Sequence, residues 1–302
     1  MYNKFSEYLK EKYNKKVYKL PINIPSNCPN RDGKIGFGGC IFCGEEGTGF
    51  ENLSNKLSIG QQLNENKERL KKRYKPEKYI AYFQNYTNTY FPIDIFKKYI
   101  IESCVKDVVA IYISTRPDCI TKEQLEFLND INCEKNIDIV LEIGLQTVNY
   151  KTLKILKRGH TLAEFIEAIF MIKEYNINTC VHYILDIPFD SIDDVIEGAK
   201  IISALKIDQV KCHSLYILEN TEIAIMYKNK EFKLLSLEDY INRAISFLEY
   251  LNPDIVVQRL VSRAPKERTI FCNWNMSWWK VHDKLIEEMN SINSYQGKRY
   301  KP

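Results

Sequence analysis

Three cysteines stand close together in residues 28–43, which read CPNRDGKIGFGGCIFC. Their spacing is C-x11-C-x2-C, and no fourth cysteine lies nearby in the sequence. Thiolates bind soft metal ions and iron–sulfur clusters, so this stretch suggests metal chemistry. The surrounding glycines allow the backbone to bend and to bring amide N–H groups close to a bound anionic group.

The residue types alone leave two kinds of metal site open. A structural zinc site usually has four ligands in two close pairs, and here the second pair is missing, although a ligand from elsewhere in the fold would complete it. An iron–sulfur cluster usually has four thiolate ligands, so three cysteines would leave one iron of a [4Fe–4S] cluster open, as a catalytic metal site requires. A disulfide between these cysteines would need an oxidising compartment.

The length and composition limit which class of protein this can be. A chain of 302 residues with 45% hydrophobic residues suits one large domain, or one domain with an extension. The sequence has no run of eighteen apolar residues and no apolar signal core near its first residue, so we expect a cytoplasmic protein with no membrane partner. The nine cysteines are then expected to be free thiols or metal ligands.

The net charge of +4 is distributed unevenly along the chain. Residues 1–20 hold six lysines and two glutamates, and residues 67–78 hold seven basic and two acidic side chains. Basic clusters of this kind bind phosphate backbones, whereas the plainer interpretation is a solvated helix face in a lysine-rich chain.

Apolar runs rich in β-branched residues alternate with amphipathic helical segments. This alternation predicts an α/β fold with parallel strands, in which the loops after the strands carry the active site. We expect a partial (β/α)6 TIM-like barrel, with an N-terminal basic helix, in residues 1–220, and a C-terminal helical extension in residues 221–302. The six predicted strands are 17–22, 79–84, 108–114, 138–144, 178–187 and 209–217, with a possible seventh at 254–260.

An ordered set of motifs resembles a known family. The set is similar to the radical S-adenosylmethionine (radical SAM) superfamily, in a bacterial subfamily of YhcC/YtqA type that is similar to the radical SAM half of the Elongator catalytic subunit. The resemblance extends over residues 17–290. The motifs are CPNRDGKIGFGGCIFC (28–43), AYFQNYTNTY (81–90), LEIGLQT (141–147), KRGHT (157–161), HYILDIP (182–188) and KCHSLYILENT (211–221).

The resemblance implies two cofactors, a [4Fe–4S] cluster and S-adenosylmethionine (SAM). It implies that Cys28, Cys40 and Cys43 ligate the cluster. The SAM-binding residues that it implies are Phe42, Gln84, Asn85, Tyr86, Thr87, Glu142, Gln146 and Arg158. Without the resemblance, Glu142 would be a charge at the end of a strand and Arg158 the last residue of a helix before the Gly159 cap.

The resemblance also implies a reaction. One-electron cleavage of SAM gives a 5′-deoxyadenosyl radical, which removes a hydrogen atom from the substrate. We expect a tRNA wobble uridine, whose carboxymethylaminomethyl side chain is remodelled toward aminomethyl, and an electron donor such as flavodoxin or ferredoxin. A small-molecule or peptide substrate and a non-catalytic zinc- or cluster-binding module are the alternatives. Two strand histidines, His182 and His213, are candidates for the cavity wall.

The cysteine assignment is directly testable. Replacing Cys28, Cys40 or Cys43 by Ala should abolish iron–sulfur absorbance and SAM cleavage in anaerobically reconstituted protein, because each thiolate holds one iron. Cys104→Ala and Cys133→Ala are matched controls and should retain both. Full cluster loading in the Cys40→Ala protein would contradict the assignment.

Overall fold

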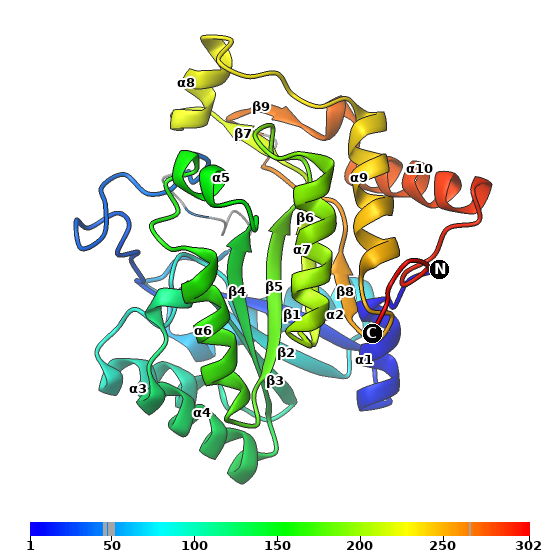
Figure 1. The fold of residues 1–302 in the computed structure, drawn as a ribbon. Helices are drawn as coiled ribbons and strands as arrows, with labels where there is room; N and C mark the ends of the chain where they lie inside the picture. The colour runs from blue at the N-terminus through cyan, green and yellow to red at the C-terminus, as the bar shows by residue number, and fades with distance from the viewer. Residues whose placement is uncertain (45–46, 48–51, 266) are drawn as a thin grey trace.

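Seven parallel strands form one curved sheet that is covered on its convex side by helices (Figure 1). The computed structural model describes residues 1–44, 47, 52–265 and 267–302. The strand order is β1-β2-β3-β4-β5-β6-β8, so neighbours in the sheet follow the order of the chain, as in a half-barrel. The strands are β1 Val17–Ile22, β2 Lys78–Phe83, β3 Val108–Thr115, β4 Asp138–Gln146, β5 Asn178–Ile184, β6 Gln209–His213 and β8 Val256–Arg259.

The predicted α/β half-barrel is confirmed, with three changes in detail. The possible seventh strand exists as β8, which pairs with β6 although it lies within the segment predicted as the extension. The run at 178–187 is shorter, because β5 ends at Ile184. The run at 209–217 is two strands: after β6 the chain leaves the sheet, and β7 (Tyr216–Leu218) pairs antiparallel with β9 (Thr269–Cys272).

The helices follow the strands as the alternation predicted. Several of them begin at a capping box, in which the Ser or Thr before the helix and the side chain three residues later satisfy each other's backbone N–H groups. These caps are Ser58, Thr121, Thr161, Ser191 and Ser236. The helices are α1 Phe5–Tyr13, α2 Ile59–Tyr74, α3 Ile93–Ser103, α4 Lys122–Lys135, α5 Tyr150–Ile155, α6 Leu162–Lys173, α7 Ile192–Ala204, α8 Glu222–Lys228, α9 Leu237–Tyr250 and α10 Trp278–Ser291.

Three apolar clusters hold these layers together. The largest lies between the convex face of the sheet and the outer helices, and Cys212 belongs to it. A second cluster, around Ile41 and Ile217, joins the cysteine segment to β7 and α8 beyond the carboxyl ends of the strands. A third fills the amino-terminal half of the concave side, where Leu9 of α1 packs against Ile80 and Tyr112. Helix α1 therefore closes one end of the half-barrel and leaves the other end for a site.

The two basic segments meet at the amino ends of β1 and β2. Backbone N–H groups of Glu77 and Lys78 donate to the carbonyl oxygen of Lys16, and the rings of Tyr18 and Tyr74 stack at 5.1 Å. The last turn of α2 leads into β2, so the basic residues there lie at the opposite end of the strands from the cysteine segment. No helix in the described part of the chain has the length and apolar composition to cross a membrane.

The packing of α7 on β5 gives a stability prediction. A Cβ at Gly198 would lie 2.3 Å from the Tyr183 hydroxyl oxygen, which donates to the Asp194 carbonyl at 3.0 Å. Gly198→Ala should lower the free energy of unfolding by about 1–3 kcal/mol, because the buried ring has to move. Gly60→Ala in α2 is the control; its Cβ would meet no atom within 4 Å, so it should be neutral or stabilise by about 0.5–1 kcal/mol. Urea denaturation measures both, and equal values would contradict the packing argument.

Candidate functional site

A pocket of about 110 Å³ lies against the three cysteines and the carboxyl-terminal halves of β2 to β5. Ten of the eleven residues predicted for the cluster and SAM line it, although they come from four separate motifs of the sequence. These ten are Cys28, Cys40, Cys43, Phe42, Gln84, Tyr86, Thr87, Glu142, Gln146 and Arg158. The exception is Asn85, which is buried beside the pocket and donates from Nδ2 to Asn23 Oδ1 at 3.4 Å.

The cysteine sulfurs lie among cationic and amide groups. Arg158 Nη1 lies 3.2 Å from Cys40 Sγ, and Asn30 Nδ2 lies 3.5 Å from the same sulfur. Arg31 Nη2 donates to the carbonyl oxygens of Cys43 and Gly44 at 3.0 and 2.6 Å. Burial outweighs the nearby Arg31 charge and raises the pKa of the Cys43 thiol to about 11. The lining therefore offers cationic and amide donors to a bound anionic group.

The pocket fits an anionic cluster. Two arginine nitrogens that border it, Arg31 Nε and Arg116 Nη1, are buried without a hydrogen-bond partner, so the donors exceed the acceptors. Within the described residues, no three His, Cys, Asp or Glu side chains converge closely enough to hold a single metal ion. Three thiolates that each bind a different iron do not need to converge in this way.

Two of the predicted SAM contacts have unusual backbone conformations. Tyr86 and Gln146 have φ angles of 52° and 74°, a region that non-glycine residues rarely adopt. Gln146 ends β4 directly after a register shift between β4 and β5, and such irregularities re-aim side chains near active sites. Backbone strain of this kind persists where the surrounding structure imposes it, and it is frequent at ligand sites.

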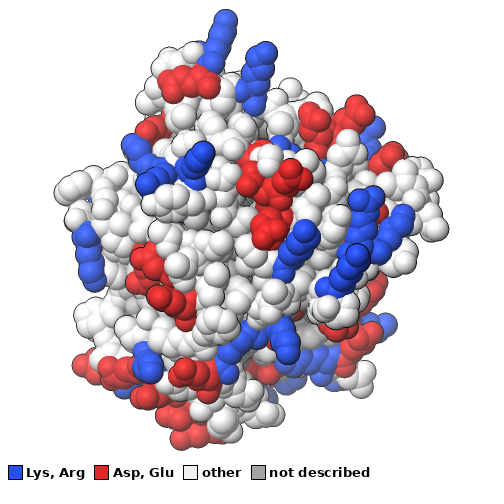
Figure 2. All heavy atoms as spheres, viewed as in Figure 1, with Lys and Arg blue, Asp and Glu red and all other residues white. Residues whose placement is uncertain are grey.

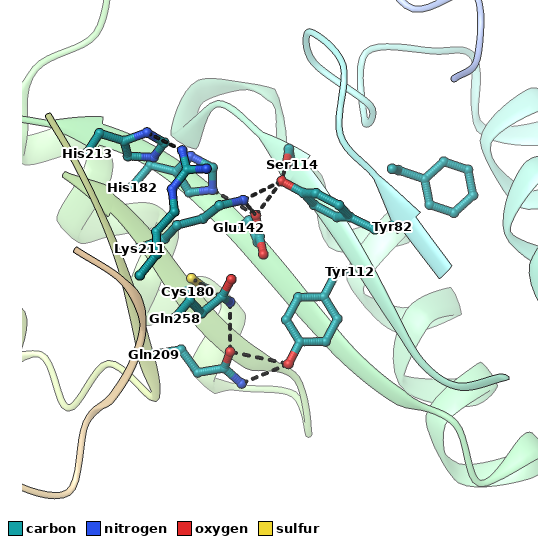
Figure 3. Close-up of polar contacts among 12 residues, drawn as sticks. Tyr82, Tyr112, Ser114, Glu142, Cys180, His182, Gln209, Lys211, His213 and Gln258 are labelled. Atoms are coloured by element: carbon teal, nitrogen blue, oxygen red, sulfur yellow. Dashed lines mark hydrogen bonds and ion pairs between the residues drawn. The ribbon is translucent and has the colours of Figure 1, made fainter. Parts of the chain in front are cut away.

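Glu142 has a different setting from the one predicted. It lies inside β4, four residues before Gln146, and not at the end of the strand. Its fully buried carboxylate accepts hydrogen bonds from Lys19 Nζ at 2.6 Å, Tyr82 Oη at 2.8 Å and Lys211 Nζ at 3.0 Å. His182 Nε2 lies 2.8 Å from the same carboxylate (Figure 3). The predicted contact of Glu142 with the SAM ribose stays a prediction, and the ribose would share a carboxylate that already has four partners.

The charges of this network follow from burial and proximity. Burial by itself would raise the pKa of Glu142, but the ammonium groups of Lys19 and Lys211 more than offset it and hold that pKa well below its usual value. Burial, followed by the Lys211 charge, lowers the pKa of His182 to about 4. Burial lowers the pKa of Lys211 to about 8, with Glu142 opposing. At neutral pH the network therefore holds an ionised Glu142, a largely charged Lys211 and a neutral His182.

The pocket beside Cys28, Cys40 and Cys43 is the thiol pocket, and a larger cavity of about 540 Å³ lies next to it. Gln84 lines both, and Tyr82 and Lys211 connect this cavity to Glu142. The cavity opens at the free edge of the half-barrel, where its wall includes Arg259 and Trp278. A substrate group in this cavity would face the cofactor pocket.

The sequence-based prediction of the site missed Lys19, Tyr82, Lys211 and Arg259. The sequence did hold a signal for the two lysines, because a charged side chain inside an otherwise apolar strand needs a partner and often lines a site. Lys19 stands in VYKLPI, and Lys211 stands in QVKCH. The two strand histidines separate in the structure. His182 lines the thiol pocket, whereas His213 lies behind it, with a distance of 5.1 Å between the ring centroids.

Comparison with known proteins confirms the resemblance. A model described as the radical SAM superfamily matches residues 22–202, and a model described as the radical SAM C-terminal domain matches residues 207–291. YtqA of Bacillus subtilis, an uncharacterized protein, is 32% identical over 298 residues, which are 98% of this chain and 92% of YtqA.

Two further relatives concern tRNA and Elongator. The tRNA uridine(34) acetyltransferase of Methanocaldococcus infernus is 27% identical over 158 residues, which are 51% of this chain and 28% of that protein. The structure of the Elp3 protein of M. infernus, with its N-terminus deleted, superimposes with a TM-score of 0.70 at 18% identity and covers 94% of this chain and 65% of that chain. The second likeness shows that the fold is shared.

Removing the carboxylate of Glu142 has two expected effects. Glu142→Ala should lower the free energy of unfolding by about 3–5 kcal/mol, because Lys19 and Lys211 lose their buried counter-charge. If the ribose contact exists, SAM affinity should also fall about ten- to a hundredfold, while iron–sulfur absorbance is kept.

Chemical denaturation and SAM titration measure the two effects separately. Glu123→Ala, which removes an exposed pair with Lys97, is the control and should cost less than about 1 kcal/mol. Lower stability with unchanged SAM affinity would make Glu142 a counter-ion only.

Proposed function

Because the chain belongs to the radical SAM superfamily, whose enzymes use a [4Fe–4S] cluster and SAM, we propose that this enzyme acts on the wobble uridine of a tRNA. The reaction that we propose is remodelling of a carboxymethylaminomethyl side chain toward aminomethyl. A small acidic redox protein such as flavodoxin or ferredoxin is the proposed electron donor.

The thiol pocket provides the setting for the cofactors. Cys28, Cys40 and Cys43 would hold the cluster there, and the bound cluster would supply the one-electron chemistry that radical SAM enzymes use. We keep Arg158 as the proposed partner of the SAM carboxylate, for which it would exchange contacts, since its Nη2 donates to the Gly144 carbonyl oxygen at 2.6 Å and its Nη1 lies 3.2 Å from Cys40 Sγ. The apolar cluster around Ile41 shields this side of the pocket from water.

The observation that carries the tRNA proposal is a basic groove along the free edge of the half-barrel. The 540 Å³ cavity borders a second cavity of about 760 Å³ that runs along α1 and the start of β1, and Phe5, Lys19 and Gln258 line both. Among the described lining residues, Glu77 is the only acidic one. The basic lining residues are Lys4, Lys10, Lys15, Lys16, Lys19, Lys211, Arg259 and Arg263.

The groove suits an RNA strand that delivers one base to the interior. Lysines along α1 can neutralise successive phosphates, and the groove leads to the cavity that faces the thiol pocket. At the mouth of the 540 Å³ cavity the Arg263 guanidinium lies 4.3 Å from the centre of the Trp278 ring, which is 39% exposed. Aromatic and guanidinium planes of this kind stack on unpaired bases. Sequence-specific recognition of RNA commonly uses such bases from single-stranded loops.

Other parts of the molecule's surface carry mixed charges, in contrast to the basic groove at the free edge of the half-barrel. On the face drawn in Figure 2, which carries α6, α7 and α9, basic and acidic side chains are interspersed and form no basic field. The segment 67–78, expected from its charge to contact phosphates, contributes only Glu77 to the described lining of the groove. Residues 1–20 therefore carry the proposed RNA contacts, and the last turn of α2 extends the basic surface beyond them.

The partial relative adds independent support. The tRNA uridine(34) acetyltransferase named above aligns over about half of this chain, and its name states that it acts on tRNA position 34. Comparative nucleoside mass spectrometry of tRNA from cells with and without the gene tests the substrate: we expect loss of aminomethyl-type wobble uridines and accumulation of the carboxymethylaminomethyl form.

The groove gives a quantitative prediction about salt. Replacing Lys10, Lys15 and Lys16 together by Gln should flatten the log–log dependence of tRNA affinity on salt by about two to three units, since each contacted phosphate contributes about 0.7–0.9. SAM cleavage without RNA should be unchanged, because these lysines lie at the other end of the strands from the thiol pocket.

The matched control changes three lysines of α3 and α4. In this control, Gln replaces Lys98, Lys122 and Lys135 together, which removes the same number of charges at a place outside the groove. The slope of affinity against salt should therefore stay as in the unmodified protein. Equal slopes in the two triple variants would contradict the groove. Failure of the unmodified protein to bind tRNA better than an acidic control protein would contradict the tRNA proposal.

A further inference from the structure

The cavity of about 540 Å³ next to the thiol pocket is the inner cavity, and its lining has more positive than negative charge. Lys19, Lys211 and Arg259 line it, and no acidic side chain is present among its described lining residues. The one carboxylate in contact with this group is Glu142, which reaches the two lysines from the neighbouring pocket. Of the cations that line this cavity, which also include Arg263 at its mouth, only Lys19 and Lys211 contact this anion. The Lys211 side chain is 8% exposed and that of Glu142 is fully buried.

Arg259 has the least compensated charge of the three. Its Nη2 donates to His213 Nδ1 at 2.6 Å, and its Nε is buried with no partner. Because Nδ1 accepts this hydrogen bond, the proton of the neutral His213 ring is on Nε2, which is also buried without a partner. Burial, followed by the Arg259 charge, holds the pKa of His213 well below its usual value, so this ring adds no charge. Both groups without partners are thus hydrogen-bond donors.

An excess of buried cations and unpaired donors is costly unless an anion joins them. We infer that Arg259 and Lys211 form a subsite for a carboxylate on the substrate, with Glu142 setting the position of Lys211. The inference rests on the proposed function, because it assigns the carboxylate of the carboxymethylaminomethyl group to these residues. A guanidinium fork and an adjacent ammonium match a carboxylate in shape and charge.

The position of the subsite explains why it would matter for the reaction. Gln84 lines both the inner cavity and the thiol pocket, and Lys211 donates to Glu142 at 3.0 Å in that pocket. A carboxylate on Arg259 and Lys211 would therefore hold the neighbouring carbon atoms toward the cofactor pocket. A backbone phosphate fits less well here, because Lys211 lies inside the half-barrel, whereas the lysines of α1 border the outer part of the groove.

Two matched RNAs test the subsite. They are anticodon stem–loops that differ only at the wobble uridine, which carries carboxymethylaminomethyl in one and aminomethyl in the other. The protein with SAM should bind the carboxylate-bearing RNA at least about tenfold more tightly, since a charge-assisted hydrogen bond is worth that much or more. In Arg259→Gln this preference should disappear.

Two further variants separate the subsite from the general charge of the groove. Arg263→Gln removes a cation from the mouth of the same cavity, so it should weaken both RNAs alike and keep the preference between them. Arg259→Lys keeps the charge but not the fork, so it should keep only part of the preference. A full preference in folded Arg259→Gln or Arg259→Lys protein would overturn the role of Arg259, and an equal affinity of the unmodified protein for both RNAs would overturn the subsite.

A measurement without RNA separates failure of the subsite from failure of the tRNA proposal. N-methylglycine carries the same terminal carboxymethylamino group, and its methyl ester lacks the carboxylate. N-methylglycine, and not the ester, should raise the melting temperature of the unmodified protein with a dependence on concentration, and Arg259→Gln should not respond. This response in a protein that binds neither RNA would support the subsite and reject the tRNA substrate, whereas its absence in the unmodified protein would overturn the subsite.

Discussion

The carboxylate of Glu142 joins four strands of the half-barrel. It accepts hydrogen bonds from Lys19 on β1, Tyr82 on β2 and Lys211 on β6, and it pairs with His182 on β5. A buried ion pair has to recover the cost of removing its charges from water, and it does so only when its geometry and its additional hydrogen bonds are good. Here a single carboxylate with four partners meets that condition. The concave wall therefore has a defined arrangement of charges, on which both the inner cavity and its link to the thiol pocket depend.

The incomplete closure of the sheet determines how a substrate reaches this wall. Because β1 and β8 are the outer strands of the seven-stranded sheet, the half-barrel has a free edge. Helix α1 closes its amino-terminal half by packing Leu9 on the concave face, and the lysines on and after α1 then border the outer groove. This short helix thus covers one end of the half-barrel, and the lysines on and beside it carry the charge that we propose for RNA. The same edge ends at Trp278 and Arg263, beside the entrance to the inner cavity.

The cysteine segment is held by its own apolar contacts. The cluster around Ile41 and Ile217 ties it to β7 and α8, two elements that leave the main sheet. After the break that follows β6, Ile217 of β7 packs in the same apolar cluster as Ile41 of the cysteine segment. The chain past residue 206, which matches the C-terminal domain of the family, contributes β6 and β8 to the main sheet, and these strands carry Lys211 and Arg259 of the inner cavity.

The sequence by itself determined the chemistry and the fold class. The spacing of Cys28, Cys40 and Cys43 indicated a metal site, and the alternation of apolar runs with amphipathic helices indicated parallel strands, because both signals are local and depend on residue type and period. The ordered motifs then placed ten residues that line one pocket. Only the tertiary structure decided which groups face each other across that pocket. Lys19 and Glu142 are 123 positions apart in the chain, and their contact depends on the curvature of the sheet and on strand register. For the same reason, only the fold showed that Asn85 lies beside the pocket and does not line it, and that Glu142 is a shared counter-ion inside its strand. It also showed that lysines of residues 1–20 border the groove, while residues 67–78 lie mainly outside it.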